Sequence, residues 1–273
     1  AWDETFGYDA NGNLTSTTRY DGGGNTIDRL TFGYQGNRIT SLSDMDGDKP
    51  LVTDYPGSTT PQAFQYDANG NMNGEPHKQF TVGYNLLNLP YVVNWSGLNR
   101  KISYYYDING RKVRKTDEDN GTVTKTDYCG PFVYETTGGV RTMKYLLTPY
   151  GRAVKSGSTW IYEYNLKDHL GNVRAVIRKG SNGLAELIQE RSYYAFGMEM
   201  SQLNGGTGTN KYLYNSKELQ DDLGLYWYDY GARFYDPMLG GWHVIDPAAE
   251  TMNPWSPYNY CDDNPLKFKD KDG

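Results

Sequence analysis

Tyr106-Asp107-Ile108-Asn109-Gly110-Arg111 is the stretch of sequence that decides the fold, because it returns along the chain. The copies range from nearly identical to degenerate and occupy residues 8–13, 66–71, 168–173, 34–38 and 84–88. Internal repetition of this kind indicates one supersecondary unit that is stacked many times.

Each copy has the features of a β-hairpin. Residues 101–106 and 111–115 flank the turn and alternate in side-chain character with the period of two that is typical of strands. Asn109-Gly110 supplies the positive φ angles of a reversing turn, and Asp107 is suited to cap that turn through its own carboxylate. Residues 119–121 and 180–183 predict two further hairpin tips. Since a single hairpin is marginal in water, we expect the hairpins to pair edge to edge into one long, twisting and curved sheet; the alternative is a β-sandwich, which three nearly identical phrases disfavour.

Composition supports an all-β protein. The 273 residues include 32 Gly and 26 Tyr but only 8 Phe. Tyrosine buries a ring while it keeps its hydroxyl in water, so this excess predicts much half-exposed sheet surface. The length suits one large or two ordinary domains, and because the chain opens inside a repeat we expect it to be a fragment of a longer protein.

Several function classes are disfavoured by the same composition. A net charge of -6 gives no electrostatic footprint for nucleic acid, and no apolar run approaches the roughly 20 residues that span a bilayer. Cys129 and Cys261 lack metal-type spacing; whether they form a disulfide is left open, with unpaired thiols favoured. Residues 44–48 resemble a calcium loop, but the glycine is fourth rather than sixth and Tyr55 stands where a glutamate is needed, so a solvated acidic loop is expected. No metal and no cofactor is expected.

The carboxy-terminal segment, residues 212–273, departs from the repeat. Ser216 is a suitable N-cap and Gly224 a suitable C-cap, which predicts a short helix between them. Dense motifs follow, and they comprise residues 231–237 (Gly-Ala-Arg-Phe-Tyr-Asp-Pro), 246–247 (Asp-Pro), 264–265 (Asn-Pro) and 270–273 (Asp-Lys-Asp-Gly). We therefore expect two parts, a hairpin segment at 1–211 and a distinct small domain at 212–273.

These motifs carry a family resemblance. The hairpin phrases resemble the YD repeats of RHS proteins, and residues 214–273 resemble the RHS repeat-associated core domain. The resemblance implies a spiralling β-hairpin shell, or cocoon, with the core domain as a plug at one end. In bacterial toxin systems such a shell holds a carboxy-terminal toxin, which the core domain frees by intramolecular aspartyl proteolysis. It further implies a secreted or cell-surface location with the export signal outside this fragment, and as partners the toxin cargo, upstream shell segments or a partner chain, and a secretion apparatus.

An aspartyl mechanism needs two carboxylates that share a proton. The resemblance places Asp246 in the family's Asp-Pro motif and Asp270 in its terminal motif. We expect catalysis by Asp246 together with Asp262 or Asp263, while Asp270 orders the strand that presents the scissile bond. Arg233, which we expect to pair with core carboxylates, and Gly273 are predicted to structure the core.

Two departures from the family pattern bear on this prediction. Gly241-Trp242 stands where the family has Arg-Phe, and Lys271 replaces the proline of the terminal motif. The aspartates could also serve only as turn caps. The alternatives are therefore a surface adhesion or carbohydrate-binding module that never cleaves, and an inert structural remnant.

Overall fold

The computed structural model describes residues 2–46, 54–251 and 255–273. Within these ranges the regular structure is almost entirely antiparallel β, which confirms the all-β prediction. The remaining elements are single 3-10 turns: η1 (Ser201–Leu203), η2 (Tyr214–Ser216), η3 (Asp222–Gly224), η4 (Ala249–Thr251) and η5 (Cys261–Asp263). None of the helices in the described part is long and apolar enough to cross a membrane.

The strands before residue 207 form two antiparallel meanders in strict chain order. The first sheet contains β1 (Asp3–Tyr8), β2 (Leu14–Tyr20), β3 (Thr26–Gln35), β4 (Arg38–Asp44) and β5 (Gln62–Ala63). The second contains β6 (Gln65–Tyr66), β7 (Met72–Glu75), β8 (Phe80–Tyr84), β9 (Pro90–Trp95), β10 (Arg100–Tyr106), β11 (Lys112–Asp119), β12 (Thr122–Cys129), β13 (Phe132–Thr137), β14 (Val140–Thr148), β15 (Gly151–Ser156), β16 (Thr159–Lys167), β17 (Val173–Lys179), β18 (Ala185–Glu190) and β19 (Gly205–Gly206). The hairpin tips predicted at 119–121 and 180–183 are confirmed.

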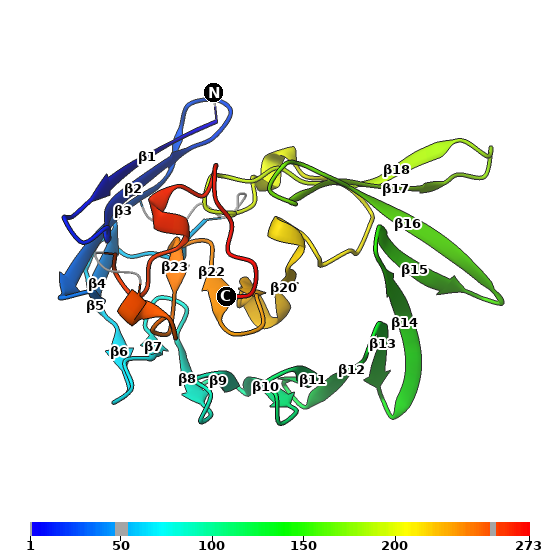
Figure 1. Ribbon diagram of the computed structural model, residues 1–273, viewed down its shortest axis with the longest axis horizontal. Coiled ribbons are helices and arrows are strands. Elements are labelled where there is room, and N and C mark those ends of the chain that lie inside the picture. Colours follow the sequence, from blue (N-terminus) through cyan, green and yellow to red (C-terminus); the bar gives the residue numbers. More distant parts are fainter. Residues whose placement is uncertain (1, 47–53, 252–254) are drawn as a thin grey trace.

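Together the two sheets form a curved wall around a small inner sheet (Figure 1). The wall does not close into a barrel, since its described strands follow a linear order within each sheet. The inner sheet consists of β20 (Glu218–Gln220), β21 (Trp227–Asp229), β22 (Phe234–Asp236) and β23 (Gly241–Trp242), paired in that order. The predicted shell-like arrangement of hairpins with a plug is therefore present.

Two details of the predicted fold are wrong. The wall is not one continuous sheet, because it breaks at Phe64: this buried residue donates its N–H to the carbonyl oxygen of Thr40 (3.2 Å), and β6 then pairs only with β7. The short helix after Ser216 is also absent, since residues 218–220 form strand β20, which pairs with β21. Cross-strand pairing with Trp227–Asp229 overrides the local capping signals.

The repeated turn is built as the sequence predicts, with one difference. Asp107 Oδ1 accepts hydrogen bonds from the backbone N–H groups of Asn109 and Arg111, both at 3.0 Å. Of the Asn-Gly pair, only Gly110 takes a positive φ (+77°). The aspartates of the other close copies, Asp9, Asp67 and Asp168, accept the same pair of bonds.

Several tyrosines of the wall tie one hairpin to the one before. Tyr106 donates its hydroxyl to the carbonyl oxygen of Pro90 at 2.8 Å, immediately after the preceding turn. The same bond recurs from Tyr34 to Leu14, Tyr84 to Met72 and Tyr193 to Val173. The ring packs between hairpins while the hydroxyl satisfies a carbonyl, which explains why the repeat uses tyrosine rather than phenylalanine.

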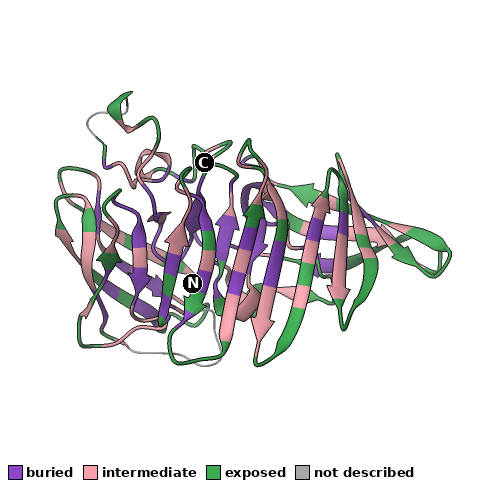
Figure 2. Cartoon of the chain, turned by 90° about the horizontal axis from the view of Figure 1, so that it is seen from below, coloured by how far each residue is buried: buried purple, intermediate pink, exposed green. Residues whose placement is uncertain are grey.

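Buried side chains concentrate where the wall faces the inner sheet. Buried residues alternate with more exposed ones along wall strands such as β3 and β8, and Figure 2 shows buried residues on many of the strands. The main core contains wall residues such as Leu30 and Leu42 together with Tyr228 and Tyr235 of the inner sheet, all 0% exposed. A second cluster packs Trp227 against Phe80 of the wall, with ring centroids 5.3 Å apart. The inner sheet therefore provides much of the hydrophobic core of the wall.

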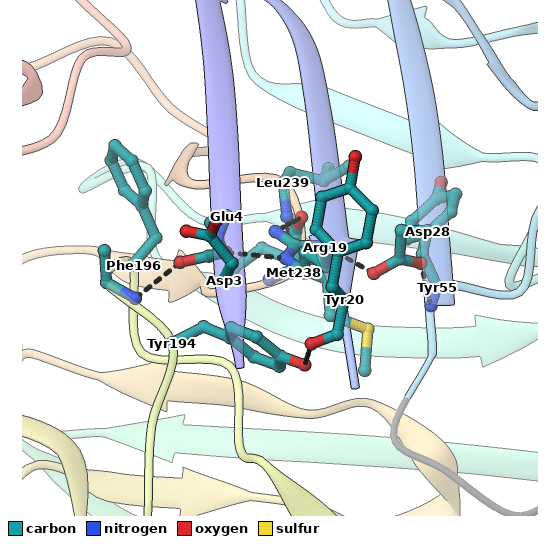
Figure 3. Close-up of polar contacts among 12 residues, drawn as sticks. Asp3, Glu4, Arg19, Tyr20, Asp28, Tyr55, Tyr194, Phe196, Met238 and Leu239 are labelled. Atoms are coloured by element: carbon teal, nitrogen blue, oxygen red, sulfur yellow. Dashed lines mark hydrogen bonds and ion pairs between the residues drawn. The ribbon is translucent and has the colours of Figure 1, made fainter. Parts of the chain in front are cut away.

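Buried ion pairs also join the wall to the inner sheet. Arg19 on β2 binds Glu4 and Asp28 at 2.9 Å each and donates to the carbonyl oxygen of Met238 at 2.9 Å (Figure 3). Lys112 on β11 likewise binds Glu218 at 2.8 Å and Asp229 at 2.6 Å. Because a buried charge without its partner is costly, these contacts fix the position of the inner sheet within the wall.

Two further expectations can be compared with the structure. Cys129 and Cys261 are both free, as favoured from the sequence. The acidic stretch 44–48 is only partly described, since Gly47 and Asp48 lie outside the described residues. Its first residue is not solvated as expected: Asp44 ends β4 and is 0% exposed.

Candidate functional site

Arg233 brings two carboxylates of the carboxy-terminal segment together. It lies just before β22 and is 2% exposed. Its Nη2 atom contacts Asp246 Oδ2 at 2.5 Å and Asp270 Oδ2 at 3.3 Å. Its guanidinium also stacks on the Trp242 ring, 4.1 Å from the centroid. Two carboxylates that are 24 positions apart in the sequence thus meet on one nitrogen.

The charge of Arg233 is retained despite its burial. Burial lowers the pKa of this guanidinium, while the charges of Asp246 and Asp270 oppose that shift. An arginine pKa is ordinarily so high that a modest reduction leaves the group protonated at any physiological pH. The two carboxylates therefore face a permanent positive charge.

Asp246 is held from both sides of its carboxylate. Its Oδ1 accepts the N–H of Ala248 at 2.7 Å, so it does cap a turn, and its Oδ2 faces Arg233. Its own N–H donates to the carbonyl oxygen of Pro257 at 3.0 Å. The side chain keeps 21% of its surface exposed, which leaves room for water to reach it.

Asp270 folds the last described residues back towards Arg233. Its Oδ1 accepts the N–H groups of Asp272 (3.0 Å) and Gly273 (2.8 Å). The Asp272 carbonyl oxygen accepts the N–H of Ala232 at 3.0 Å, and Lys217 donates to the carbonyl of Lys271. Residues 270–273 are therefore held beside Arg233 by both side-chain and backbone contacts.

Gly273 lies closest to the arginine backbone. Its φ is +95°, and a Cβ there would lie 2.9 Å from the Arg233 nitrogen and 3.0 Å from Tyr230 Cβ. Both the backbone angle and the contact require glycine at this position. A peptide bond that follows Gly273 would begin next to the Arg233 cluster.

The other two predicted catalytic residues occupy the turn η5, in which Cys261, Asp262 and Asp263 all have positive φ. Asp262 lines a cavity of about 240 Å³ together with Arg233, Asp246 and Asp270. Asp263 points elsewhere: it accepts a bond from Asn259 Nδ2 at 2.5 Å, and a Cβ at Gly12 of the first repeat turn would lie 2.9 Å from its Oδ2. The structure thus places Asp270, rather than Asp263, beside Asp246.

Burial gives two groups near this cavity unusual pKa values. Burial raises the pKa of Asp263 to about 6, and the bond from Asn259 opposes that shift. Burial also raises the pKa of the Cys261 thiol, which lines the cavity, to about 12, so this cysteine is not poised as a nucleophile. The carboxylates that line the cavity are therefore the candidates for acid–base chemistry there.

Sequence reasoning missed two contributors to the site. Trp242, noted only as a departure from the family pattern, provides the aromatic face on which Arg233 stacks. Lys217 reaches residue 271 across 54 positions of sequence. Neither contact has a local signal, because both depend on how the inner sheet folds.

The fold and the site together define a hairpin-repeat shell around an inner sheet that carries a clustered aspartate pair. No family model matches the chain. It is 25% identical over 279 residues, covering 95% of its length, to the tRNA3(Ser)-specific nuclease WapA of Bacillus spizizenii. It is 26% identical over 195 residues, covering 63%, to toxin subunit YenC1 of Yersinia entomophaga, and 25% identical over 298 residues, covering 99%, to salivary gland surface protein 1 of Aedes aegypti.

Solved structures share the fold. The TcdB2-TccC3-Cdc42 structure matches with a TM-score of 0.63 and 18% identity over all of this chain, and the Photorhabdus luminescens Tc holotoxin pore matches with 0.63 and 18% over 98%. The chain spans only 11%, 8% and 19% of the WapA, salivary gland and YenC1 relatives, and 16% and 15% of the two matched chains. These similarities support the RHS-like toxin relationship that the repeats indicate, and a toxin-associated shell role in general.

Proposed function

We propose that this chain is part of the shell of a secreted bacterial RHS-type toxin, that it encloses and presents a carboxy-terminal toxin, and that it cuts itself near Gly273. The shell segment is 1–211 and the plug is 212–273. In support, the last described wall strand ends at Gly206 and the inner sheet begins at Glu218. The partners are the toxin cargo and further shell segments or a partner chain.

The single observation that carries the self-cleavage proposal is the meeting of Asp246 and Asp270 on Arg233 Nη2. In the proposed mechanism the pair holds one proton, so that one carboxylate acts as base while the other acts as acid. The base takes a proton from water, and the water oxygen attacks the carbonyl carbon of the peptide bond. The acid gives its proton to the amide nitrogen, the C–N bond breaks, and a carboxylic acid and an amine result.

The chain itself supplies the positioning that this reaction needs. Residues 270–273 are fixed by Ala232, by Lys217 and by the carboxylate of Asp270. Holding the peptide beside the acid pair replaces a bimolecular encounter with an intramolecular one. We therefore place Asp270 in the catalytic pair, with Asp262 as a neighbour in the same cavity.

The test is intact-mass analysis of a chain that continues past Gly273 into a reporter segment. The parent is expected to yield two products, and Asp246→Asn and Asp270→Asn are expected to stay intact. Asp263→Asn, whose carboxylate points towards Gly12, serves as the matched control and is expected to cleave. A parent that stays whole under all conditions would contradict self-cleavage and favour the adhesion alternative. Cleavage by Asp270→Asn but not by Asp263→Asn would return the second catalytic role to Asp263.

A further inference from the structure

A second cluster of carboxylates lies at the first wall sheet. It comprises Asp28 on β3, Asp44 at the end of β4, and Asp54, which directly precedes Tyr55. One carboxylate oxygen from each residue lies within 4.8 Å of the others. Asp28 and Asp44 are 0% exposed, and Asp54 is half-buried.

Backbone contacts hold these aspartates in place. Asp28 Oδ1 accepts the N–H of Tyr55 at 3.0 Å, which fixes the segment that carries Asp54 against β3. Asp44 Oδ1 accepts the N–H groups of Arg29 (3.0 Å) and Asp46 (3.1 Å). The geometry is therefore set by the fold and not by attraction among the carboxylates, which repel one another.

The second oxygen of Asp44 provides an independent indication of a ligand. Asp44 Oδ2 is buried and has no hydrogen-bond partner in the structure of the described residues. A Cβ at Gly57 would lie 2.2 Å from Asp44 Cβ and 3.1 Å from this oxygen, so the backbone closes over the carboxylate. A buried anionic oxygen without a donor is costly, and each such group in a native structure calls for a partner.

Among the described residues, one arginine faces Asp28 and no cation pairs with Asp44. Arg19 binds Asp28 Oδ2 but also binds Glu4, so two carboxylates divide its single charge. Arg29 pairs through its side chain with Asp46 and not with Asp44. The negative charges of Asp28 and Asp46 repel that of Asp44. A bound cation would relieve that repulsion.

We propose that Asp28, Asp44 and Asp54 bind one Ca²⁺ ion. The donors are all carboxylate oxygens. Such oxygens favour hard divalent cations such as Ca²⁺, whereas zinc and copper favour nitrogen and sulfur ligands. Calcium binds oxygens at about 2.3–2.6 Å in irregular geometry, so ligands on opposite sides of it stand roughly 5 Å apart; magnesium needs a tighter octahedron. The ion would join β3, β4 and the segment at Asp54, next to the Arg19 contact with Met238.

The test is isothermal titration of CaCl2 into the chelator-stripped chain, with MgCl2 in a parallel titration. We expect one Ca²⁺ site per chain, with a Kd of about 10⁻⁴–10⁻³ M or tighter, as in extracellular calcium modules, and a Tm that rises with added calcium. Absence of saturable calcium binding, or saturable binding of magnesium alone, would overturn the assignment.

Asp44→Asn separates calcium binding from folding. The amide oxygen can still accept the two backbone N–H groups, while the buried negative charge is lost. The variant is therefore expected to lose calcium binding but, in chelator, to melt at the same temperature as the parent or higher. Asp3→Asn, an exposed aspartate on β1 of the same sheet, is the control and should keep calcium binding. Calcium affinity in Asp44→Asn equal to that of the parent would refute the site.

Discussion

Lys78 of the wall and Asp236 of β22 form an ion pair of 2.8 Å in which the two side chains are only 3% and 0% exposed. Burial would raise the pKa of Asp236, but the charge of Lys78 and the bond with His243 outweigh it and hold the pKa well below its usual value. The wall thus keeps an anion ionised at the centre of the inner sheet. Among the described ion pairs between the wall and the inner sheet, this pair is the most deeply buried.

Loss of the Lys78 charge should lower the free energy of unfolding. Lys78→Met would leave the Asp236 carboxylate buried without its cation, and breaking a buried pair from one side typically costs about 3–5 kcal/mol. Lys101→Met is the matched control, since Lys101 and Glu118 form an exposed pair on the same wall and should contribute less than about 1 kcal/mol. Urea unfolding followed by tryptophan fluorescence measures both. If Lys78→Met and Lys101→Met lowered the free energy of unfolding equally, the buried Lys78–Asp236 pair would stabilise the fold no more than the exposed pair.

The hydroxyl of the repeated tyrosine should contribute measurably at each hairpin. Tyr106→Phe removes the bond to the Pro90 carbonyl oxygen and leaves that acceptor unsatisfied, so we expect a loss of about 0.5–1.5 kcal/mol. Tyr105→Phe, at the neighbouring position but 51% exposed, should change stability by less than about 0.5 kcal/mol. Chemical unfolding of both variants distinguishes them, and indistinguishable midpoints would mean that the bond adds nothing in water.

The fold could be predicted in its repeating part because its signals are local. The turn around Asp107 and Gly110 needs only residues within five positions, and the alternating flanks need only the strand period. The break at Phe64 and the strand at 218–220 could not be read in this way. Both arise when a buried residue or a paired strand elsewhere outweighs a local preference.

The sequence predicts which residues belong to the candidate site but not how they are arranged in space. Motifs drew attention to Arg233, Asp246 and Asp270, but the partner chosen for Asp246 was a residue closer in sequence. Asp246 and Asp270 meet because both face one guanidinium, which itself rests on Trp242. Such a relationship involves four separate segments, and no spacing rule in a single sequence encodes it.

Asp263 should make stability fall as pH rises through mildly acidic values. Its pKa is about 6 in the folded chain but starts from 3.8, so between these values the unfolded chain releases a proton that the folded chain retains. Its unfavourable contribution is therefore absent below about pH 4 and complete above about pH 6. Asp263→Asn should flatten this part of a Tm-versus-pH curve, and Asp262→Asn, which removes one charge that raises the same pKa, should flatten it less. A parent curve that rises from pH 4 to 7 with the same slope as that of Asp263→Asn would contradict the assignment.

Arg233 should set the pH range of the proposed self-cleavage. Arg233→Gln removes the positive charge that both carboxylates face, so we expect it to slow the reaction at the parent's pH optimum and to move that optimum to higher pH.

Arg233→Lys separates charge from shape. A lysine keeps the positive charge near Asp246 and Asp270 but gives up the planar stacking on Trp242, so its pH optimum should stay near that of the parent even if its rate falls. Arg141→Gln, an exposed position on β14, is the control for a lost arginine charge. Cleavage rates measured by gel from pH 4 to 9 on the extended chain give all four profiles. If Arg233→Gln cleaved with the optimum and rate of the parent, the shared guanidinium would have no part in the chemistry, and the Asp246–Asp270 pair would be only a structural contact of the plug.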